Sequence, residues 1–365
     1  MIIHLVAAAR PNFMKIAPLY HRLKAEAWAE PVIVHTGQHY DFNMSDAFFR
    51  NLKLPDPAIH LSVGSGTHAQ QTGNVMIAYE KVLMDGDRPD LAIVVGDVNS
   101  TAAVALASVK LGVKVAHLEA GLRSFDRTMP EEINRIVTDA LADILWTPSP
   151  DAGANLLREG VPAEKIEMVG NIMIDSLEMM RQAIERERYY DSLGLVPAAY
   201  AVVTLHRPSN VDSPETLRKL VHHLVSAAGR LPLVFPLHPR TRKNLAALGL
   251  LDALESFPGV RLVEPLPYIP FMSLIFNCRL VVTDSGGVQE ETTYLGIPCI
   301  TLRPNTERPI TVTQGTNRLC GIDQMEEKID EIFAAPIQAV SIPALWDGRT
   351  ANRVAASIHR FLHLL

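Results

Sequence analysis

The sequence predicts two α/β domains, each with a doubly wound parallel sheet. Short, almost wholly apolar runs alternate with amphipathic stretches, a pattern typical of parallel sheets covered by helices on both faces. The alternation runs through the first half of the chain and begins again in the second half. A chain of 365 residues is also longer than one hydrophobic core usually supports. These observations together indicate two similar domains.

The expected elements follow in chain order. Strands of the first series are predicted over residues 2–8, 32–34, 91–95, 113–118 and 144–146, with helices that include 14–27, 101–111 and 130–142. Strands of the second series are predicted over 201–205, 233–236, 260–263, 280–283 and 299–302, with helices such as 214–228 and 269–277. The first series ends near residue 170, where a helix over 172–188 follows. We therefore expect domains over 1–170 and 171–349, and a last helix within 350–365 that could pack on either.

Composition favours a small-molecule partner. The formal net charge of -6 gives no general attraction for nucleic acid or an anionic membrane surface. Three scattered cysteines in apolar surroundings are typical of reduced core thiols, so we expect a cytoplasmic protein. The N-terminus has no basic leader and reaches Arg10 and Pro11 too early for a signal peptide, and no apolar run approaches the length of a membrane span.

Polar side chains follow the predicted strands in both halves. Ligands of open parallel sheets sit beyond the carboxyl ends of the strands, so this is where functional residues are expected. The residues in these positions are Arg10, Gln38, His39, Asp97, Glu119, His206, His238 and Ser285. Because they come from both halves, they indicate one cleft between two domains.

The segment TDSGGVQEE, residues 283–291, predicts an anion site. Ser285, Gly286 and Gly287 lie between an apolar strand and a helix, where backbone N–H groups and the helix dipole can hold a phosphate. Glu291, about one turn later, is expected to accept hydrogen bonds from sugar hydroxyls. The alternative is that Ser285 caps the helix and the glycines only turn the chain. A phosphorylated sugar or nucleotide is the expected ligand.

Three carboxylates, Asp97, Glu119 and Glu131, are candidates for acid/base chemistry. Carboxyl groups close together in a partly dry cleft acquire different pKa values, so one can take a proton while another gives one. Purely structural roles stay open for two of them: Asp97 could cap a helix, and Glu131 could form an exposed ion pair with Arg135, four residues on. Arg123 is a candidate partner for the Glu119 carboxylate.

Cationic groups complement these acids, and they include Arg10, Lys15, His206, His238 and Arg308. Neither histidine nor carboxylate spacing suggests a metal site. The chain has no GxSxG elbow, no GxxxxGKS loop and no GxGxxG after the first strand, which argues against serine hydrolases, NTP-dependent phosphoryl transfer and Rossmann dehydrogenases. We expect neither a metal nor another cofactor.

With these residues in view, the chain strongly resembles the non-hydrolysing UDP-N-acetylglucosamine 2-epimerases. The resemblance runs nearly end to end, through the segments RPNFMKIAPL, TGQH, GDVNST, HLEAGLRS, MPEEINR, GNIMID, TLHRPSN, LHPRT, TDSGGVQEE, TERPI and DGRTANR. It implies two Rossmann-like domains of the glycosyltransferase B type, facing a central cleft, with the last helix crossing back to the first domain. It also implies a homodimer.

The resemblance implies a reaction as well. UDP-GlcNAc and UDP-ManNAc would interconvert by anti elimination of UDP through 2-acetamidoglucal and by re-addition, supplying ManNAc-type sugars for cell-surface polysaccharide. Asp97, Glu119, Glu131 and His206 would be catalytic. The UDP-sugar would be bound by Arg10, Lys15, Arg135, His238, Leu266, Phe271, Ser285, Gly286, Gly287, Glu291 and Arg308, with Leu266 and Phe271 near uracil. Gln38 and His39 mark a possible effector region.

The chain departs from the family pattern in two places. Ala8 and Ala9 replace the common Gly-Thr before Arg10, and Asn12 replaces a glutamate. Tyr40 and Asp41 replace the residues that often follow the Gln-His pair, which puts activation by a second UDP-GlcNAc in doubt. Three alternatives stay open: an epimerase of another UDP-2-acetamido sugar, a B-type glycosyltransferase using a UDP-sugar donor, and a nucleotide-sugar-binding regulator without turnover.

Overall fold

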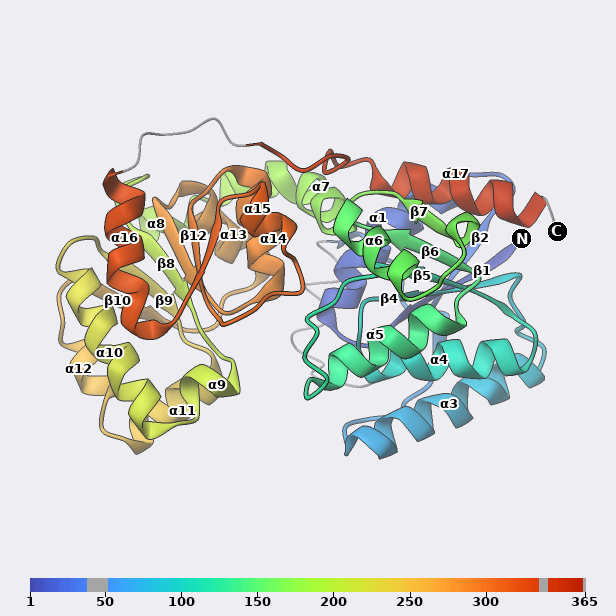
Figure 1. Cartoon of the computed structure of the whole chain (residues 1–365), viewed down its shortest axis with the longest axis horizontal. Coiled ribbons are helices and arrows are strands. Elements are labelled where there is room, and N and C mark those ends of the chain that lie inside the picture. Colours follow the sequence, from blue (N-terminus) through green and yellow to red (C-terminus); the bar gives the residue numbers. More distant parts are fainter. Residues whose placement is uncertain (38–51, 335–340, 364–365) are drawn as a thin grey trace. The chain divides into compact units, whose positions relative to one another are not determined.

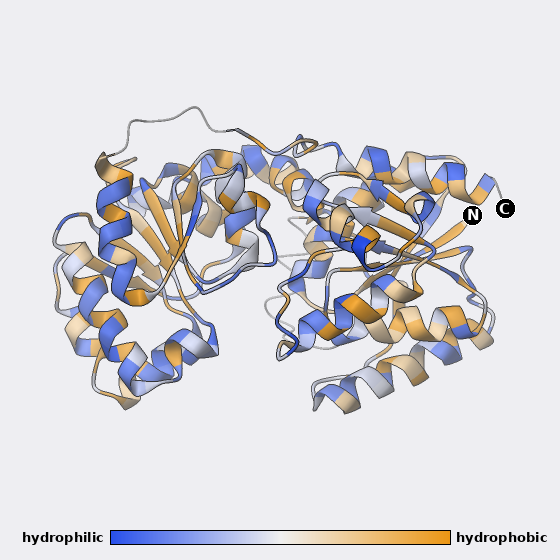
Figure 2. Cartoon of the chain, in the orientation of Figure 1, coloured by the Kyte–Doolittle hydropathy of each residue, from blue (hydrophilic) through white to orange (hydrophobic). Residues whose placement is uncertain are grey.

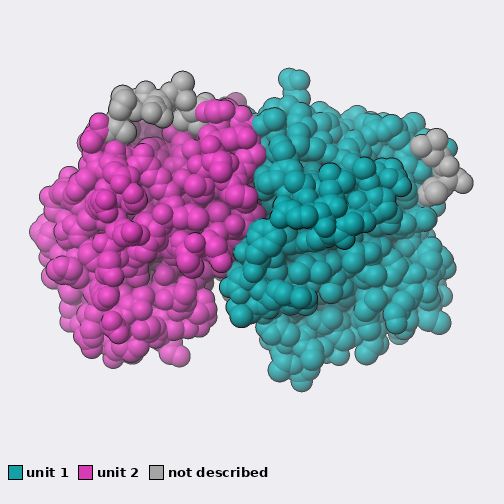
Figure 3. Space-filling model, viewed as in Figure 1, with its two compact units in different colours: residues 1–179, 344–365 teal, residues 180–343 magenta. Residues whose placement is uncertain are grey.

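The computed structural model describes residues 1–37, 52–334 and 341–363, which divide into two units. Unit 1 comprises Met1–Met179 and Ala344–Leu365, and unit 2 comprises Met180–Pro343 (Figure 3). The division lies inside helix α7 (Ile172–Glu187), whereas the limit expected from the sequence, residue 170, precedes this helix.

Unit 1 is built on a parallel sheet in the order β3-β2-β1-β4-β5-β6-β7. The strands are β1 (Ile2–Ala7), β2 (Glu30–His35), β3 (Ile59–His60), β4 (Leu91–Val95), β5 (Lys114–Leu118), β6 (Ile144–Thr147) and β7 (Ile166–Met168). The central strand, β4, is buried along its whole length, as expected for a sheet covered on both faces. Figure 2 shows these strands as mostly hydrophobic between helices with hydrophilic outer faces.

The helices of unit 1 begin at recognisable signals. They are α1 (Arg10–Lys24), α3 (His68–Met84), α4 (Asn99–Lys110), α5 (Pro130–Leu141), α6 (Pro150–Arg158), most of α7, and α17 (Thr350–His363). Proline occupies the first turn of α1, α5 and α6, and Thr67 caps α3 by accepting a hydrogen bond from the Gln70 amide. The last helix, α17, lies beside α1 (Figure 1), and Ser357 on it accepts a hydrogen bond from Trp146 Nε1 at 2.9 Å.

Unit 2 repeats the plan with a parallel sheet in the order β10-β9-β8-β11-β12-β13. Its strands are β8 (Ala201–Thr204), β9 (Leu233–Pro236), β10 (Val260–Val263), β11 (Leu280–Thr283), β12 (Cys299–Leu302) and β13 (Asn317–Cys320). Its helices are α8 (Tyr189–Ser192), α9 (Pro208–Val211), α10 (Pro214–Ala228), α11 (Pro239–Ala247), α12 (Leu251–Glu255), α13 (Tyr268–Asn277), α14 (Gly286–Leu295), α15 (Ile310–Thr313) and α16 (Met325–Ala334).

The predicted fold class is confirmed in both units. Each sheet reverses its strand order beside its first strand, at β1/β4 and at β8/β11, which is the doubly wound arrangement whose ligands lie beyond the strand ends. Three strands, β3, β7 and β13, were missed, and all three are sheet edges. Among the described residues no helix is long and apolar enough to cross a membrane.

Candidate functional site

In unit 1, Glu119 and Lys15 form a buried ion pair at the end of β5. Glu119 directly follows the strand, its carboxylate Oε2 pairs with Lys15 Nζ of α1, and both side chains are buried. The predicted partner of Glu119, Arg123, was wrong: its guanidinium pairs with Asp139 Oδ2 at 2.7 Å and Glu159 Oε2 at 2.6 Å. Gly96 makes room for the pair, because a Cβ there would lie 3.0 Å from Lys15 Nζ.

Glu119 also has an unusual backbone. Its φ is +73°, in the left-handed region that non-glycine residues rarely adopt and that clusters at functional sites. Its second carboxylate oxygen, Oε1, is buried and has no hydrogen-bond partner among the described residues. A buried acceptor that lacks a donor costs free energy, so this oxygen is suited to receive a proton or a donor from a ligand.

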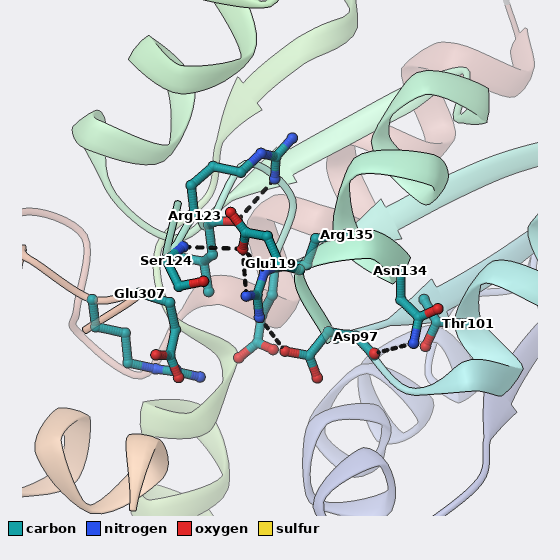
Figure 4. A network of polar contacts seen from close by, with 12 residues as sticks. Asp97, Thr101, Glu119, Arg123, Ser124, Asn134, Arg135 and Glu307 are labelled. Atoms are coloured by element: carbon teal, nitrogen blue, oxygen red, sulfur yellow. Dashed lines mark hydrogen bonds and ion pairs between the residues drawn. The ribbon is translucent and has the colours of Figure 1, made fainter. Parts of the chain in front are cut away.

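Asp97 follows β4 and meets Arg135 of α5. Asp97 Oδ2 lies 2.5 Å from Arg135 Nη1 (Figure 4), and the Asp97 side chain is 32% exposed while that of Arg135 is 2% exposed. The possibility that Asp97 caps the next helix is not realised, because the N-cap of α4 is Val98. Arg135 therefore holds a half-exposed carboxylate at the carboxyl edge of the sheet.

The ion pair considered between Glu131 and Arg135 is not formed. Arg135 Nη2 instead donates to Glu132 Oε2 at 2.6 Å, and Glu132 is buried. Glu131 lies in the first turn of α5 with an exposed side chain. Glu131 and Arg135 were therefore selected from the sequence, but Glu132, the carboxylate that Arg135 binds, was missed.

Two further buried residues lie behind the carboxylates. His117 Nδ1 is 2.6 Å from Asp139 Oδ1, and His117 Nε2 is 2.8 Å from the Gly96 carbonyl oxygen. Burial alone would raise the pKa of Asp139. The adjacent His117 and Arg123 have a larger, opposite effect, so the pKa of Asp139 lies below its ordinary value. His117 lies on β5, two residues before Glu119, and was not selected from the sequence.

In unit 2, Asp284 fixes the segment that carries His206. The Asp284 carboxylate is fully buried and accepts hydrogen bonds from the backbone amides of His206 at 3.0 Å and Arg207 at 2.9 Å, and from Asn210 Nδ2 at 3.1 Å. His206 Nδ1 lies 3.1 Å from Asp284 Oδ1, and its imidazole is 40% exposed. Burial alone would raise the pKa of Asp284, but His206 and the amide donors bring it below its ordinary value.

His238 follows β9 beside His206, with ring centroids 5.4 Å apart. His238 is the N-cap residue of α11, and its Nδ1 accepts a hydrogen bond from the Arg240 amide. Burial, followed by the nearby His206 and Arg240, lowers the pKa of His238. The two predicted histidines are therefore brought together at neighbouring strand ends.

Ser285, Gly286 and Gly287 form the start of α14. Ser285 occupies the N-cap position that the capping alternative gives it, but its side chain makes no capping hydrogen bond. Gly286 and Gly287 are helical and have no positive φ, so they do not turn the chain. A Cβ on Gly286 would lie 2.7 Å from Arg308 Nη1, whereas a Cβ on Gly287 would meet nothing within 4 Å. The N–H groups of the first turn have no intrahelical acceptor, so this helix end has donors whose hydrogen bonds a bound anion could accept.

Arg308 is held at this helix end by buried carboxylates. Its Nε lies 2.8 Å from Glu290 Oε1 and its Nη1 2.6 Å from Glu307 Oε1, while Arg303 Nη2 donates to Glu307 Oε2 at 2.9 Å. Burial raises the pKa of Glu307, but the two arginines take it well below the ordinary value. Glu290, Arg303 and Glu307 were not selected from the sequence.

Glu291 differs from the other buried acids because its partner is a phenol. Tyr268, the first residue of α13, donates its hydroxyl to Glu291 Oε1 at 2.7 Å. Burial raises the pKa of Glu291 to about 7, with a further rise from Glu290 and an opposing effect of the Tyr268 hydrogen bond. Leu266 precedes α13 and Phe271 lies on it, both half-buried. Tyr268 was not predicted as part of the site.

Of the other predicted residues, Arg10 is exposed and begins α1. Asn12, one of the departures, accepts from the Ala9 amide at 3.0 Å and donates to the Val95 carbonyl at 3.2 Å, which a glutamate could not do. Gln38 and His39 lie outside the described residues. Within the described ranges, no group of three or more His, Cys, Asp or Glu side chains could hold a metal ion.

Comparisons with known proteins agree with one another. A family model described as UDP-N-acetylglucosamine 2-epimerase matches residues 21–359. The chain is 43% identical over 338 residues to the enzyme of that name from Methanocaldococcus jannaschii, with 91% of each chain covered. It is 42% identical over 320 residues to the UDP-2,3-diacetamido-2,3-dideoxy-D-glucuronate 2-epimerase of Pseudomonas aeruginosa, with 87% of each covered.

Solved structures give the same result. The crystal structure of the Methanocaldococcus jannaschii enzyme in complex with UDP-GlcNAc and UDP matches with a TM-score of 0.89 at 39% identity, over 99% of this chain and 100% of that one.

Proposed function

Because the chain belongs to the UDP-N-acetylglucosamine 2-epimerase family, we propose that it interconverts UDP-GlcNAc and UDP-ManNAc. The observation that carries this proposal is the match to the Methanocaldococcus enzyme over nine-tenths of both chains. The acid/base and anion-site residues described above fit the same chemistry.

The reaction is an elimination followed by an addition. A base removes the proton at carbon 2 while the bond from carbon 1 to the UDP oxygen breaks on the opposite face, which gives 2-acetamidoglucal and UDP. UDP then returns to carbon 1, and a proton is delivered to the other face of carbon 2. No electrons are exchanged with an external reagent, so the reaction consumes neither an oxidant nor a reductant.

Unit 1 would supply the proton-transfer groups. Asp97, Glu119 and Glu131 are the acid/base candidates, and Lys15 offsets the cost of burying the Glu119 carboxylate. The unpartnered Oε1 of Glu119 supports a role in which this oxygen gains a proton or a donor during turnover. Lys15, Arg10 and Arg135 would also contribute positive charge for the departing UDP.

Unit 2 would hold the nucleotide. The first-turn amides of α14, from Ser285 to Gly287, would bind pyrophosphate with Arg308 and His238, and Glu291 would accept hydrogen bonds from the ribose. Leu266 and Phe271 would lie against uracil. His206, fixed by Asp284, would act near the pyrophosphate as the leaving oxygen gains charge.

A second substrate is favoured by one specific observation. The relative from Pseudomonas aeruginosa, named for a UDP-2,3-diacetamido-2,3-dideoxy-D-glucuronate, is nearly as similar to this chain as the UDP-GlcNAc enzyme. The elimination needs only the acetamido-bearing carbon 2 and a UDP leaving group, which both sugars provide. The groups that the chain presents to carbons 3 and 6 would decide between them.

The test is a panel of UDP-sugars followed by NMR in deuterated water. We expect UDP-ManNAc to form from UDP-GlcNAc without added metal or nicotinamide, with deuterium entering at carbon 2. Product without deuterium would exclude the elimination. Stoichiometric free ManNAc would indicate hydrolysis, and turnover of the diacetamido glucuronate alone would support the second substrate.

We further propose that the enzyme works in the cytoplasm as a homodimer and supplies sugars for cell-surface polysaccharide. Three buried free cysteines support a reducing compartment. Ile77 and Met84, two turns apart on α3, are 67% and 71% exposed, which supports an apolar contact with a second copy. Light scattering after size-exclusion chromatography tests the dimer, and a monomer at micromolar concentration would contradict it.

A further inference from the structure

We propose that Glu132 is a positioning residue of the epimerase, which acts through Arg135 to fix the carboxylate of Asp97 for proton transfer. This inference rests on the proposed function, in which Asp97 reacts at carbon 2. Glu132 itself is buried and would not touch the substrate.

The contacts form a chain from the interior to the reacting carboxylate. Glu132 Oε2 accepts from Arg135 Nε at 3.1 Å and Nη2 at 2.6 Å, which occupies one edge of the guanidinium. The remaining nitrogen, Nη1, lies 2.5 Å from Asp97 Oδ2. Because a guanidinium is planar and rigid, its orientation on Glu132 determines the direction in which Nη1 points.

Glu132 is itself fixed by backbone groups. Its Oε2 accepts from the Ser124 amide at 3.0 Å, and its Oε1 accepts from the Phe125 amide at 2.9 Å. Phe125 has a φ of +59°, so the loop before α5 holds a conformation that costs free energy and that these hydrogen bonds stabilise. A side chain held on both oxygens cannot change rotamer without losing several buried hydrogen bonds.

The charges around Asp97 define what Glu132 contributes. Arg135 faces Asp97 from α5, while Lys15 of α1 and Glu119 after β5 lie around the neighbouring Gly96. The positive charge of Arg135 is thus shared between two carboxylates. Without the Glu132 carboxylate, one edge of the guanidinium would lose its acceptor, and Nη1 would no longer be directed at Asp97.

The experiment compares Glu132→Gln with Glu159→Gln. Glu159 is a matched control, since it also binds a buried arginine through both oxygens, Arg123, but its side chain is 39% exposed and its partner does not contact Asp97. We expect Glu132→Gln to reduce kcat on the order of 10²-fold, because small misplacements of a reacting group have this effect, with little change in KM. Glu159→Gln should stay close to wild type.

Two readouts separate positioning from folding. Glu132→Asp, which keeps the charge, should restore part of the lost kcat. In an Asp97→Asn background, Glu132→Gln should cause little further loss of kcat, because the two residues act through one connected set of contacts.

A crystal structure of Glu132→Gln distinguishes failure of this inference from failure of the proposed function. Wild-type protein without epimerase activity would refute the function, while displacement of Arg135 from Asp97 in the variant would still establish the coupling. An unmoved Arg135, or wild-type kcat in folded Glu132→Gln, with or without a lower melting temperature, would overturn the positioning role.

Discussion

The two units share one strand order but place different chemistry at their strand ends. In unit 1 the residues that follow β4 and β5, Asp97 and Glu119, are carboxylates paired with cations from neighbouring helices. In unit 2 the start of α14 offers backbone amides, and a buried acid of that helix, Glu291, meets a tyrosine hydroxyl. The same strand order thus carries ion-paired carboxylates in unit 1 and a helix start rich in backbone donors in unit 2.

The contrast is clearest for buried carboxylates. Burial raises the pKa of Glu132, but the amides of Ser124 and Phe125 and the guanidinium of Arg135 bring it below its ordinary value. Glu291 has no such cation, and burial leaves its pKa near 7. Glu132 therefore stays ionised, whereas Glu291 can hold a proton. The partner that the fold supplies makes the difference.

The largest effect is expected from Asp97→Asn. If proton transfer belongs to unit 1 alone, this change should reduce turnover by about 10²–10⁴-fold, the usual contribution of a positioned acid or base. UDP affinity, measured by calorimetry, should stay within a few-fold of wild type, because the amides of α14 are untouched. Glu80→Gln, an exposed acid on α3, is the control.

Near-normal turnover in Asp97→Asn would contradict the role of unit 1 in proton transfer, since Asp97 would then be only a structural partner of Arg135. A parallel loss of UDP affinity would instead show that unit 1 also binds the nucleotide.

A smaller effect concerns the pH dependence of stability through Glu291. Its pKa is about 7 in the folded protein against 4.5 for an ordinary glutamate, so between these values the folded state binds more protons than the unfolded state. The free energy of unfolding should therefore fall as pH rises through this window, by on the order of 3 kcal/mol. Glu291→Gln, which carries no titrating proton, should lack this decline.

The measurement is urea denaturation at pH 5 and pH 8, with Glu255→Gln, an exposed acid on α12, as control. Tyr268→Phe removes the hydrogen bond that lowers the pKa of Glu291, so the decline should continue to higher pH than in wild type. If wild type and Glu291→Gln lose stability in parallel as pH rises, Glu291 is ionised in the folded protein and the contrast with unit 1 disappears.

Much of the fold could be predicted because buried central strands are read directly as apolar runs. The bounds of β4, β9, β10, β11 and β12 agree with the runs in the sequence. Edge strands such as β7 are half-buried and contain polar residues, so the same signal is weak. Helix α3 has only Val75, Tyr79 and Leu83 fully buried among polar residues, although the capping box at Thr67 and Gln70 could have revealed its start.

The candidate site was predictable in position but not in pairing. Strand ends are fixed by topology, so Asp97, Glu119 and His206 could be selected from the sequence alone. Partners depend on side-chain direction and on distant segments: Lys15 reaches Glu119 from a helix 104 residues earlier. Arg135 meets Glu132 at i,i+3 and not Glu131, because the first faces the interior and the second faces solvent.

The smallest expected effect compares Gly286→Ala with Gly287→Ala. Both replace a helical glycine, so both gain helix propensity, by up to about 1 kcal/mol. Gly287→Ala should realise part of this gain, since its Cβ would meet nothing within 4 Å. Gly286→Ala should not, because its Cβ would displace Arg308, whose guanidinium is held between Glu290 and Glu307. Melting temperatures without ligand test this difference.

The UDP affinity of the same two variants then shows whether the first-turn amides of α14 or the guanidinium of Arg308 contributes more to the proposed binding of the nucleotide. A displaced Arg308 should weaken UDP in Gly286→Ala by at least about tenfold, since a hydrogen bond to a charged group contributes roughly 1.5–3 kcal/mol. Equal weakening in Gly287→Ala, where Arg308 stays in place, would mean that the ligand occupies the open space at that amide. Wild-type affinity in both variants would remove the start of α14 from the nucleotide site, and unit 2 would lose the feature that distinguishes it from unit 1.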